Sequence, residues 1–155
     1  MYDTLFDDEF QQFIKQFEGF SDESYLDSAG VPTIGWGTIK YPDGRKVELG
    51  QTISKTEANA IFEYHCKDDY SRMIKLLPLN DNIKKPQLIA LLSFVYNVGL
   101  TQFKESTLLK FLKKDFLLLA SEQFLRWIYV KGVIVPGLVK RRTAESEKFK
   151  QGLPI

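Results

Sequence analysis

Residues 18–38, EGFSDESYLDSAGVPTIGWGT, decide the fold and contain the side chains of greatest chemical interest. A carboxylate, Glu18, opens the stretch; a second carboxylate, Asp27, follows after eight residues, and a hydroxyl, Thr33, after five more. Cleavage of a glycosidic bond needs one carboxyl group that donates a proton to the leaving oxygen and another that activates water or attacks the sugar. Glu18, Asp27 and Thr33 are therefore candidate catalytic residues.

An amphipathic helix precedes these candidates. Four apolar residues between positions 10 and 17 recur at helical spacing, which predicts a helix from about Asp7 to Glu18, with Thr4 or Asp7 as its N-cap. Gly19 is the residue expected just past its end. The partial negative charge at a helix C-terminus and the neighbouring phenylalanines favour the protonated form of a carboxyl group, as a general acid requires. Asp27 lies in a polar run and is expected to stay ionised.

Spacing alone leaves a second interpretation open, in which the three residues are ordinary surface groups, because acidic side chains mostly lie in solvent. The surrounding segments favour the first interpretation. EGF, YLDSAGVPTIGWGT, SFVYNVG and PGLVKRR-x-AE resemble the phage-type lysozymes, or endolysins, of glycoside hydrolase family 24. The catalytic signature of that family, Glu-x8-Asp/Cys-x5-Thr, matches Glu18, Asp27 and Thr33 without a gap. The resemblance extends from about Phe13 to Phe149.

The resemblance implies an α+β, lysozyme-like fold that is mostly helical. Residues 1–155 would form one domain, with a small antiparallel sheet lobe at about 19–53, a long connecting helix at about 54–77, and a helical lobe at about 78–155 together with the N-terminal helix. The implied activity is hydrolysis of the β-1,4 bond between N-acetylmuramic acid and N-acetylglucosamine in peptidoglycan, with inversion, leading to lysis of the host cell. A lytic transglycosylase, a silent glycan-binding module and a secreted interbacterial effector are the alternatives.

The resemblance also assigns roles to residues. Glu18 is the general acid, Asp27 orients and activates water or stabilises the positive charge on the sugar, and Thr33 helps to hold that water. The implied substrate-binding residues are Ile39, Tyr96, Asn97 and Ser106. Two positions depart from the family: Thr38 stands where a structural His is usual, which puts the local strand pairing in doubt, and Ile128 stands where Asn is frequent.

The composition of the chain limits the number of domains and the kinds of binding site that it can form. With 155 residues, 44% hydrophobic, the chain has the size of one domain. The net charge of +1 conceals an asymmetry, since residues 1–77 carry 8 basic and 14 acidic side chains and residues 78–155 carry 13 and 6. This asymmetry suits either contact between the lobes or binding of an anionic polymer. A single cysteine, Cys66, and a single histidine, His65, exclude an intramolecular disulfide and make a zinc site implausible.

We expect no metal, no cofactor, no nucleic-acid partner, no membrane insertion and no signal peptide. The expected partner is the peptidoglycan glycan strand, bound by a monomer. The protein would stay in the host cytoplasm until a holin-type pore lets it reach the wall.

Local signals predict the other elements. A turn at residues 41–44 leads to a strand at 46–48, and a capping box at Ser54 and Glu57 begins a helix that runs to about Leu77. Further helices are expected at 86–98, 107–114, 116–128 and 138–149, with a loop at 130–137. We expect either Arg141 or Arg142 to pair with Glu18 or the sheet lobe, although solvated charges on the last helix fit the sequence equally well.

Overall fold

The computed structural model describes residues 2–154, so both ends of the expected domain range 1–155 lie outside it. The helices in these residues are α1 (Asp8–Glu18), α2 (Lys55–Ile74), α3 (Lys85–Val98), α4 (Leu100–Glu105), α5 (Thr107–Lys113), α6 (Leu117–Gln123) and α7 (Pro136–Lys150), with 3-10 helices η1 (Tyr2–Thr4) and η2 (Phe124–Arg126). The strands are β1 (Ser21–Leu26), β2 (Pro32–Gly35), β3 (Tyr129–Val130) and β4 (Val133–Ile134). Helices dominate, as the sequence predicted.

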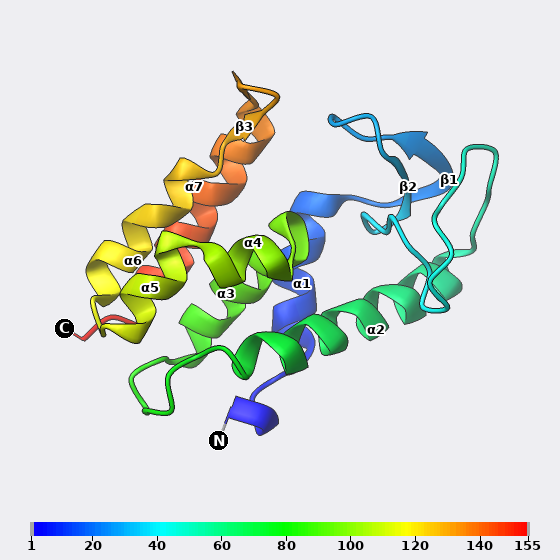
Figure 1. Ribbon diagram of the computed structural model, residues 1–155. Coiled ribbons are helices and arrows are strands. Elements are labelled where there is room, and N and C mark those ends of the chain that lie inside the picture. The colour runs from blue at the N-terminus through cyan, green and yellow to red at the C-terminus, as the bar shows by residue number, and fades with distance from the viewer. Residues whose placement is uncertain (1, 155) are drawn as a thin grey trace.

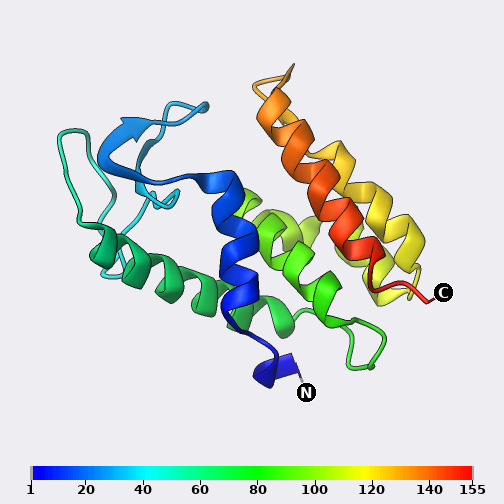
Figure 2. The ribbon, with the colours of Figure 1, turned by 180° about the vertical axis from the view of Figure 1, so that it is seen from behind.

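The molecule has two parts joined by one long helix (Figure 1). We use the term sheet lobe for residues 19–53, on the right of Figure 1, and helical lobe for α1 with residues 78–154. Helix α2 runs beneath both. Viewed from behind, α1 stands between the sheet lobe and helices α3 and α7 (Figure 2).

Helix α1 begins and ends where its sequence predicts. Asp7 caps its start, because the Asp7 carboxylate accepts a hydrogen bond of 3.1 Å from the backbone N–H of Glu9. Gly19 ends it with a φ of 65°. The buried face of the helix carries Phe10 and Ile14. This placement brings Glu18 to the last position of the helix, next to the sheet lobe.

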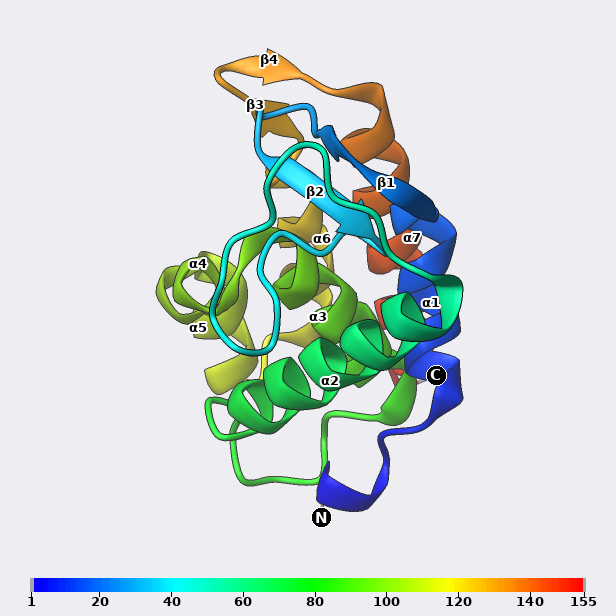
Figure 3. The same ribbon diagram turned by 90° about the vertical axis from the view of Figure 1, so that its right-hand side faces the viewer.

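The sheet of the sheet lobe consists of two strands, β1 and β2. β1 and β2 are antiparallel, with Tyr25 opposite Thr33, and the loop that follows them lies across their face (Figure 3). The expected turn forms, since the N–H of Gly44 bonds the carbonyl of Tyr41 at 2.9 Å. The expected strand at 46–48 was wrong: this segment makes only an isolated bridge from Lys46. The side chain of Gln51 bonds the backbone N–H of residue 48 and so replaces a strand partner there.

Helix α2 belongs to both lobes. The predicted capping box is present, with the N–H of Glu57 bonded to Ser54 Oγ at 3.1 Å. Ala58, near its start, packs in a small core with Ile34, Val47 and Ile53 of the sheet lobe. Its later buried residues belong to the main core of the helical lobe. The helix ends three residues before the predicted position, because residues 76 and 77 make tighter 3-10-type turns.

The helical lobe is built around α3, whose residues 87–95 are all buried. Gly99, with a φ of 93°, ends α3 and precedes α4. Helix α4 has no counterpart among the predicted helices; it has six residues, of which only Phe103 is buried. Such a short segment gives almost no periodic signal.

The region after α5 also differs from expectation. One helix was predicted at 116–128, whereas the structure has α6 and then the tighter turn η2. The predicted loop at 130–137 contains the β3–β4 hairpin, whose turn residues Lys131 and Gly132 have φ values of 51° and 79°. Pro136 opens α7, two residues earlier than predicted, at a position where a helix needs no N–H donor.

Candidate active site

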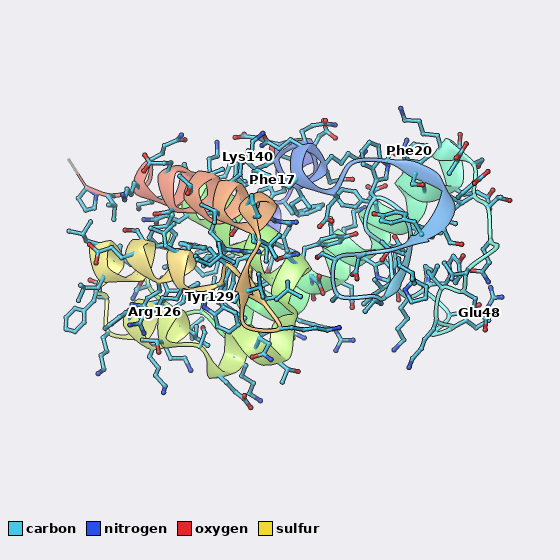
Figure 4. The ribbon with its side chains drawn as sticks, turned by 90° about the horizontal axis from the view of Figure 1, so that it is seen from above. Phe17, Phe20, Glu48, Arg126, Tyr129 and Lys140 are labelled. Atoms are coloured by element: carbon cyan, nitrogen blue, oxygen red, sulfur yellow. The ribbon has the colours of Figure 1, made fainter. Side chains whose placement is uncertain are left out.

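A cleft of about 450 Å³ lies between the sheet lobe and the helical lobe. Its walls come from the end of α1, from the β1–β2 sheet with its turns, and from parts of α3 and α7. Seen from above, Phe17 and Lys140 lie where α1 meets α7, and Phe20 and Glu48 lie on the sheet lobe (Figure 4). The cleft residues include Glu18, Asp27, Thr33, Gly37, Ile39, Tyr96, Asn97, Lys140 and Arg141. The three candidate catalytic residues thus share one cleft.

Glu18 is held on two sides. Its side chain is 15% exposed, and Oε2 accepts a hydrogen bond of 2.7 Å from Arg141 Nη1. Of the two candidate arginines, the structure therefore places Arg141 beside Glu18. On the other side, the backbone of Gly37 comes so close that a Cβ there would lie 2.4 Å from Glu18 Oε1. The φ of 77° at Gly37 also favours glycine.

Asp27 lies in the turn that joins β1 to β2. Its Oδ1 accepts hydrogen bonds from the backbone N–H groups of Ala29 at 2.9 Å and Val31 at 2.8 Å. Gly30, with a φ of 81°, lets the chain close this turn. Among the described residues no hydrogen bond reaches Asp27 Oδ2. The turn therefore fixes the carboxylate through one oxygen and leaves the other for a ligand.

Thr33 is buried in β2, with 3% of its surface exposed. Its hydroxyl donates a hydrogen bond of 2.8 Å to the carbonyl oxygen of Val31. Because the single hydroxyl proton is already used, Thr33 offers the cleft an acceptor oxygen rather than a donor.

Asn97 and Arg141 are positioned by a buried network on α7 and α3. Arg142 donates to Asn97 Oδ1, to the carbonyl of Trp127 at 3.1 Å and to Glu145 Oε1 at 2.5 Å. Glu145 Oε2 accepts from Ser93 Oγ at 2.6 Å and from Arg141 Nε at 3.3 Å. Glu145 and Arg142 are fully buried. One acidic residue thus anchors both arginines.

Burial acts on both charges of this network. It raises the pKa of the Glu145 carboxyl, and the neighbouring arginines act in the opposite direction. Burial also lowers the pKa of Arg142 to about 10, against the effect of Glu145, so the guanidinium is charged at neutral pH. Sequence reasoning missed Glu145. Its signal was its spacing from Arg141 and Arg142, at i+4 and i+3, which places all three on one face of a helix.

The four expected substrate-binding residues have different settings. Ile39 is 51% exposed and lines the cleft with Tyr96 and Asn97. The Tyr96 hydroxyl donates to the carbonyl of Trp36 at 2.8 Å. Ser106 does not line this cleft: it is buried, and its Oγ caps α5 by accepting from the N–H of Leu109 at 3.1 Å.

Thr38 preserves the strand pairing that its departure from the family put in doubt. Its backbone exchanges two hydrogen bonds of 2.9 Å with Ile34, and its side chain is buried.

A second hollow of about 400 Å³ continues from the cleft past Asp27 and Asn97 and is also lined by Arg126 and Trp127. The two hollows together form an extended groove.

A family model confirms the resemblance. The phage lysozyme model matches residues 15–145. The chain belongs to the phage lysozyme family. Among solved structures, the endolysin from Escherichia coli O157:H7 phage FAHEc1 has a TM-score of 0.82 and 30% identity, covering 96% of this chain and 95% of that chain. The expected α+β, lysozyme-like fold is thereby confirmed.

Relatives within the phage lysozyme family are named endolysins. The chain is 36% identical over 140 residues to an endolysin of Bacillus phage B103, covering 90% of this chain and 51% of that protein. It is 34% identical over 145 residues to an endolysin of Acyrthosiphon pisum secondary endosymbiont phage 1, covering 88% and 92%. The chain spans about half the length of the Bacillus phage relatives it matches.

Metal-binding clusters and membrane-spanning helices are both absent from residues 2–154. No group of three or more His, Cys, Asp or Glu side chains in that range is arranged to hold a metal ion. No helix in the same range has both the length and the apolar character needed to cross a membrane.

Proposed function

We propose that the protein is an endolysin that hydrolyses the β-1,4 bond between N-acetylmuramic acid and N-acetylglucosamine in bacterial peptidoglycan. The observation that carries this proposal is one cleft lined by Glu18, Asp27 and Thr33, the residues that match the family signature. The adjoining hollow past Asp27 supports a polymeric substrate, because the extended groove has room beyond the bond to be cleaved.

The proposed mechanism uses two carboxyl groups. Glu18 donates its proton to the leaving glycosidic oxygen, and the Arg141 guanidinium at 2.7 Å stabilises the carboxylate that remains. Asp27 accepts a proton from water through Oδ2 as the water oxygen bonds to the sugar carbon and the glycosidic bond breaks. Thr33 accepts a hydrogen bond from the same water. Attack on the far face of the sugar gives inversion.

Three further residues are proposed to bind sugar. Asn97 offers its amide N–H groups, because Arg142 occupies its carbonyl oxygen and thereby fixes its orientation. Ile39 supplies exposed apolar surface for a sugar face. The ring of Tyr96 lines the same wall. Ser106 would contribute to the site only indirectly, by capping α5. The proposed reaction needs no metal or cofactor.

The relatives' name supports a role in host lysis. In this proposal the protein acts as a monomer on glycan strands. It remains in the host cytoplasm until a holin-type pore gives access to the wall, without binding nucleic acid or inserting into the membrane.

Zymography on purified peptidoglycan tests the activity. Glu18→Gln is expected to remove lysis while the melting temperature stays close to that of the unmodified protein. Glu48→Gln is the matched control, since Glu48 is an exposed carboxylate on the sheet lobe, away from the cleft residues (Figure 4). Mass spectrometry of the products separates hydrolysis from transglycosylation, which leaves anhydro-sugar ends. Lysis by Glu18→Gln, or anhydro products from the unmodified protein, would refute the proposal.

A further inference from the structure

Tyr96 connects the two walls of the cleft. It comes from α3, and its hydroxyl donates the 2.8 Å hydrogen bond to the carbonyl oxygen of Trp36, in the turn directly after β2. The ring packs edge-on against Phe62 of α2, with centroids 5.3 Å apart. Since the phenol proton is bonded within the protein, it is not available to donate to a sugar.

Trp36 is held firmly by its other contacts. Its indole N–H donates to Asn59 Oδ1 at 2.7 Å, and the Lys15 ammonium lies 4.8 Å from the ring centroid. These contacts come from α2 and α1 and fix the side chain. The hydrogen bond from Tyr96 instead fixes the backbone carbonyl of Trp36. This bond comes from α3, in the helical lobe.

The peptide that carries this carbonyl leads directly to Gly37, whose backbone lies against Glu18. A Cβ on Gly37 would be 2.4 Å from Glu18 Oε1 and 2.8 Å from Cδ. The Arg141 guanidinium binds the other oxygen of the carboxyl group. The Glu18 carboxyl therefore lies between a guanidinium and the backbone of residue 37, and that backbone shares a planar peptide with the Trp36 carbonyl.

The Tyr96 hydroxyl keeps its proton, and so remains a hydrogen-bond donor, over a wide pH range. Burial raises the pKa of Tyr96 well above its ordinary value, and the charge of Glu18 raises it further, while the Thr38 side chain acts in the opposite direction. The phenol therefore stays protonated at neutral and mildly alkaline pH. The hydrogen bond to Trp36 persists throughout that range.

We propose that Tyr96 is a positioning residue whose hydrogen bond to the Trp36 carbonyl sets the turn at residues 36–37 against Glu18 and thereby places the proton donor. This inference rests on the proposed role of Glu18 as general acid. It differs from the sugar contact that the family resemblance implies for Tyr96, because the hydroxyl acts on the protein rather than on the substrate.

Tyr96→Phe removes the hydroxyl and keeps the ring. On soluble peptidoglycan fragments, we expect kcat to fall about tenfold, because misplacing a catalytic group affects the chemical step. KM is expected to stay within about twofold, because ground-state binding is retained. Affinity is measured separately by calorimetry in an inactive background, comparing Glu18→Gln with Glu18→Gln/Tyr96→Phe, and should be equal in the two. Tyr64→Phe, on the exposed face of α2, is the control for loss of a tyrosine hydroxyl.

A fall in affinity with kcat unchanged would show that the Tyr96 hydroxyl is a sugar ligand and would overturn the inference. An unchanged kcat and KM would also overturn it. A crystal structure of Tyr96→Phe gives a readout that does not depend on activity. Residues 36–37 and the Glu18 carboxyl should be displaced, and an unmoved carboxyl would also overturn the inference. Failure of the proposed function is distinguishable, because the unmodified protein would then release no muropeptides or only products with anhydro-sugar ends.

Discussion

Replacing Gly37 with alanine tests how closely the backbone must approach the proposed proton donor. The added Cβ would lie 2.4 Å from Glu18 Oε1, 2.8 Å from Cδ and 3.3 Å from Cγ. Ordinary contacts between such atoms are about 3.4 Å or longer, so the carboxyl must move by about 1 Å or the turn must yield. The φ of 77° adds strain of about 1–2 kcal/mol for any residue with a Cβ.

These two effects have different consequences for activity and stability. A misplacement of about 1 Å lowers a catalysed rate by up to about 100-fold, and we expect a loss of that order in the kcat of Gly37→Ala. The strain alone should lower the melting temperature by about 2–8 °C for a chain of this length. Release of reducing ends from soluble peptidoglycan measures the first quantity, and differential scanning calorimetry measures the second.

Gly44→Ala is the matched control for backbone strain. Gly44 has a φ of 94°, but a Cβ there would meet no atom within 4 Å. It should lose comparable stability and keep full activity. If Gly37→Ala were as active as Gly44→Ala, the close approach of residue 37 would not position Glu18, and the reasoning would be refuted.

Two further predictions concern carboxyl groups whose pKa is raised by partial or full burial. Burial raises the pKa of Asp69 to about 7, Asp68 adds to this, and Arg72 opposes it. Because this pKa lies above the unfolded value, the folded state binds the proton more tightly and stability falls as pH rises from about 4 to 7, by at most about 4 kcal/mol. Asp69→Asn should remove that fall, which urea titrations at pH 4.5 and 8 would measure as the free energy of unfolding. If the substitution changed this free energy equally at both pH values, the prediction would be contradicted. Glu145→Gln leaves the buried Arg142 without a carboxylate partner, while Arg141 keeps Glu18, and it should cost about 3 kcal/mol of unfolding free energy and lower kcat; unchanged stability would contradict this prediction.

Features with a local cause were predictable from the sequence. Asp7 and Gly19 delimit α1 because a cap and a left-handed glycine act on adjacent backbone. The capping box at Ser54 and Glu57 works within four residues. The strand expected at 46–48 failed because a side chain, Gln51, took the bond that a neighbouring strand would have supplied. Whether Gln51 takes this bond depends on how the loop folds, and no sequence pattern indicates it.

The site was only partly predictable for the same reason. The family signature selected Glu18, Asp27 and Thr33, and the structure brings them to one cleft. Their supports come from distant positions: Arg141 is 123 residues from Glu18, and Tyr96 is 60 residues from Trp36. Contacts across such separations leave no periodicity. Ser106 shows the converse, since the resemblance associated it with substrate, whereas its side chain caps the start of α5.

The shared helix α2 has a consequence for how the protein opens. Among the described residues, the hydrophobic cluster of the sheet lobe has four buried side chains, and one of them, Ala58, belongs to α2. The backbone amides of β1 and β2 should therefore exchange their hydrogens with solvent sooner than those of α3. Asp27 and Thr33 sit in that less protected part. A glycan strand lying across both walls would slow the exchange there, so occupancy of the groove and local order of the sheet rise together.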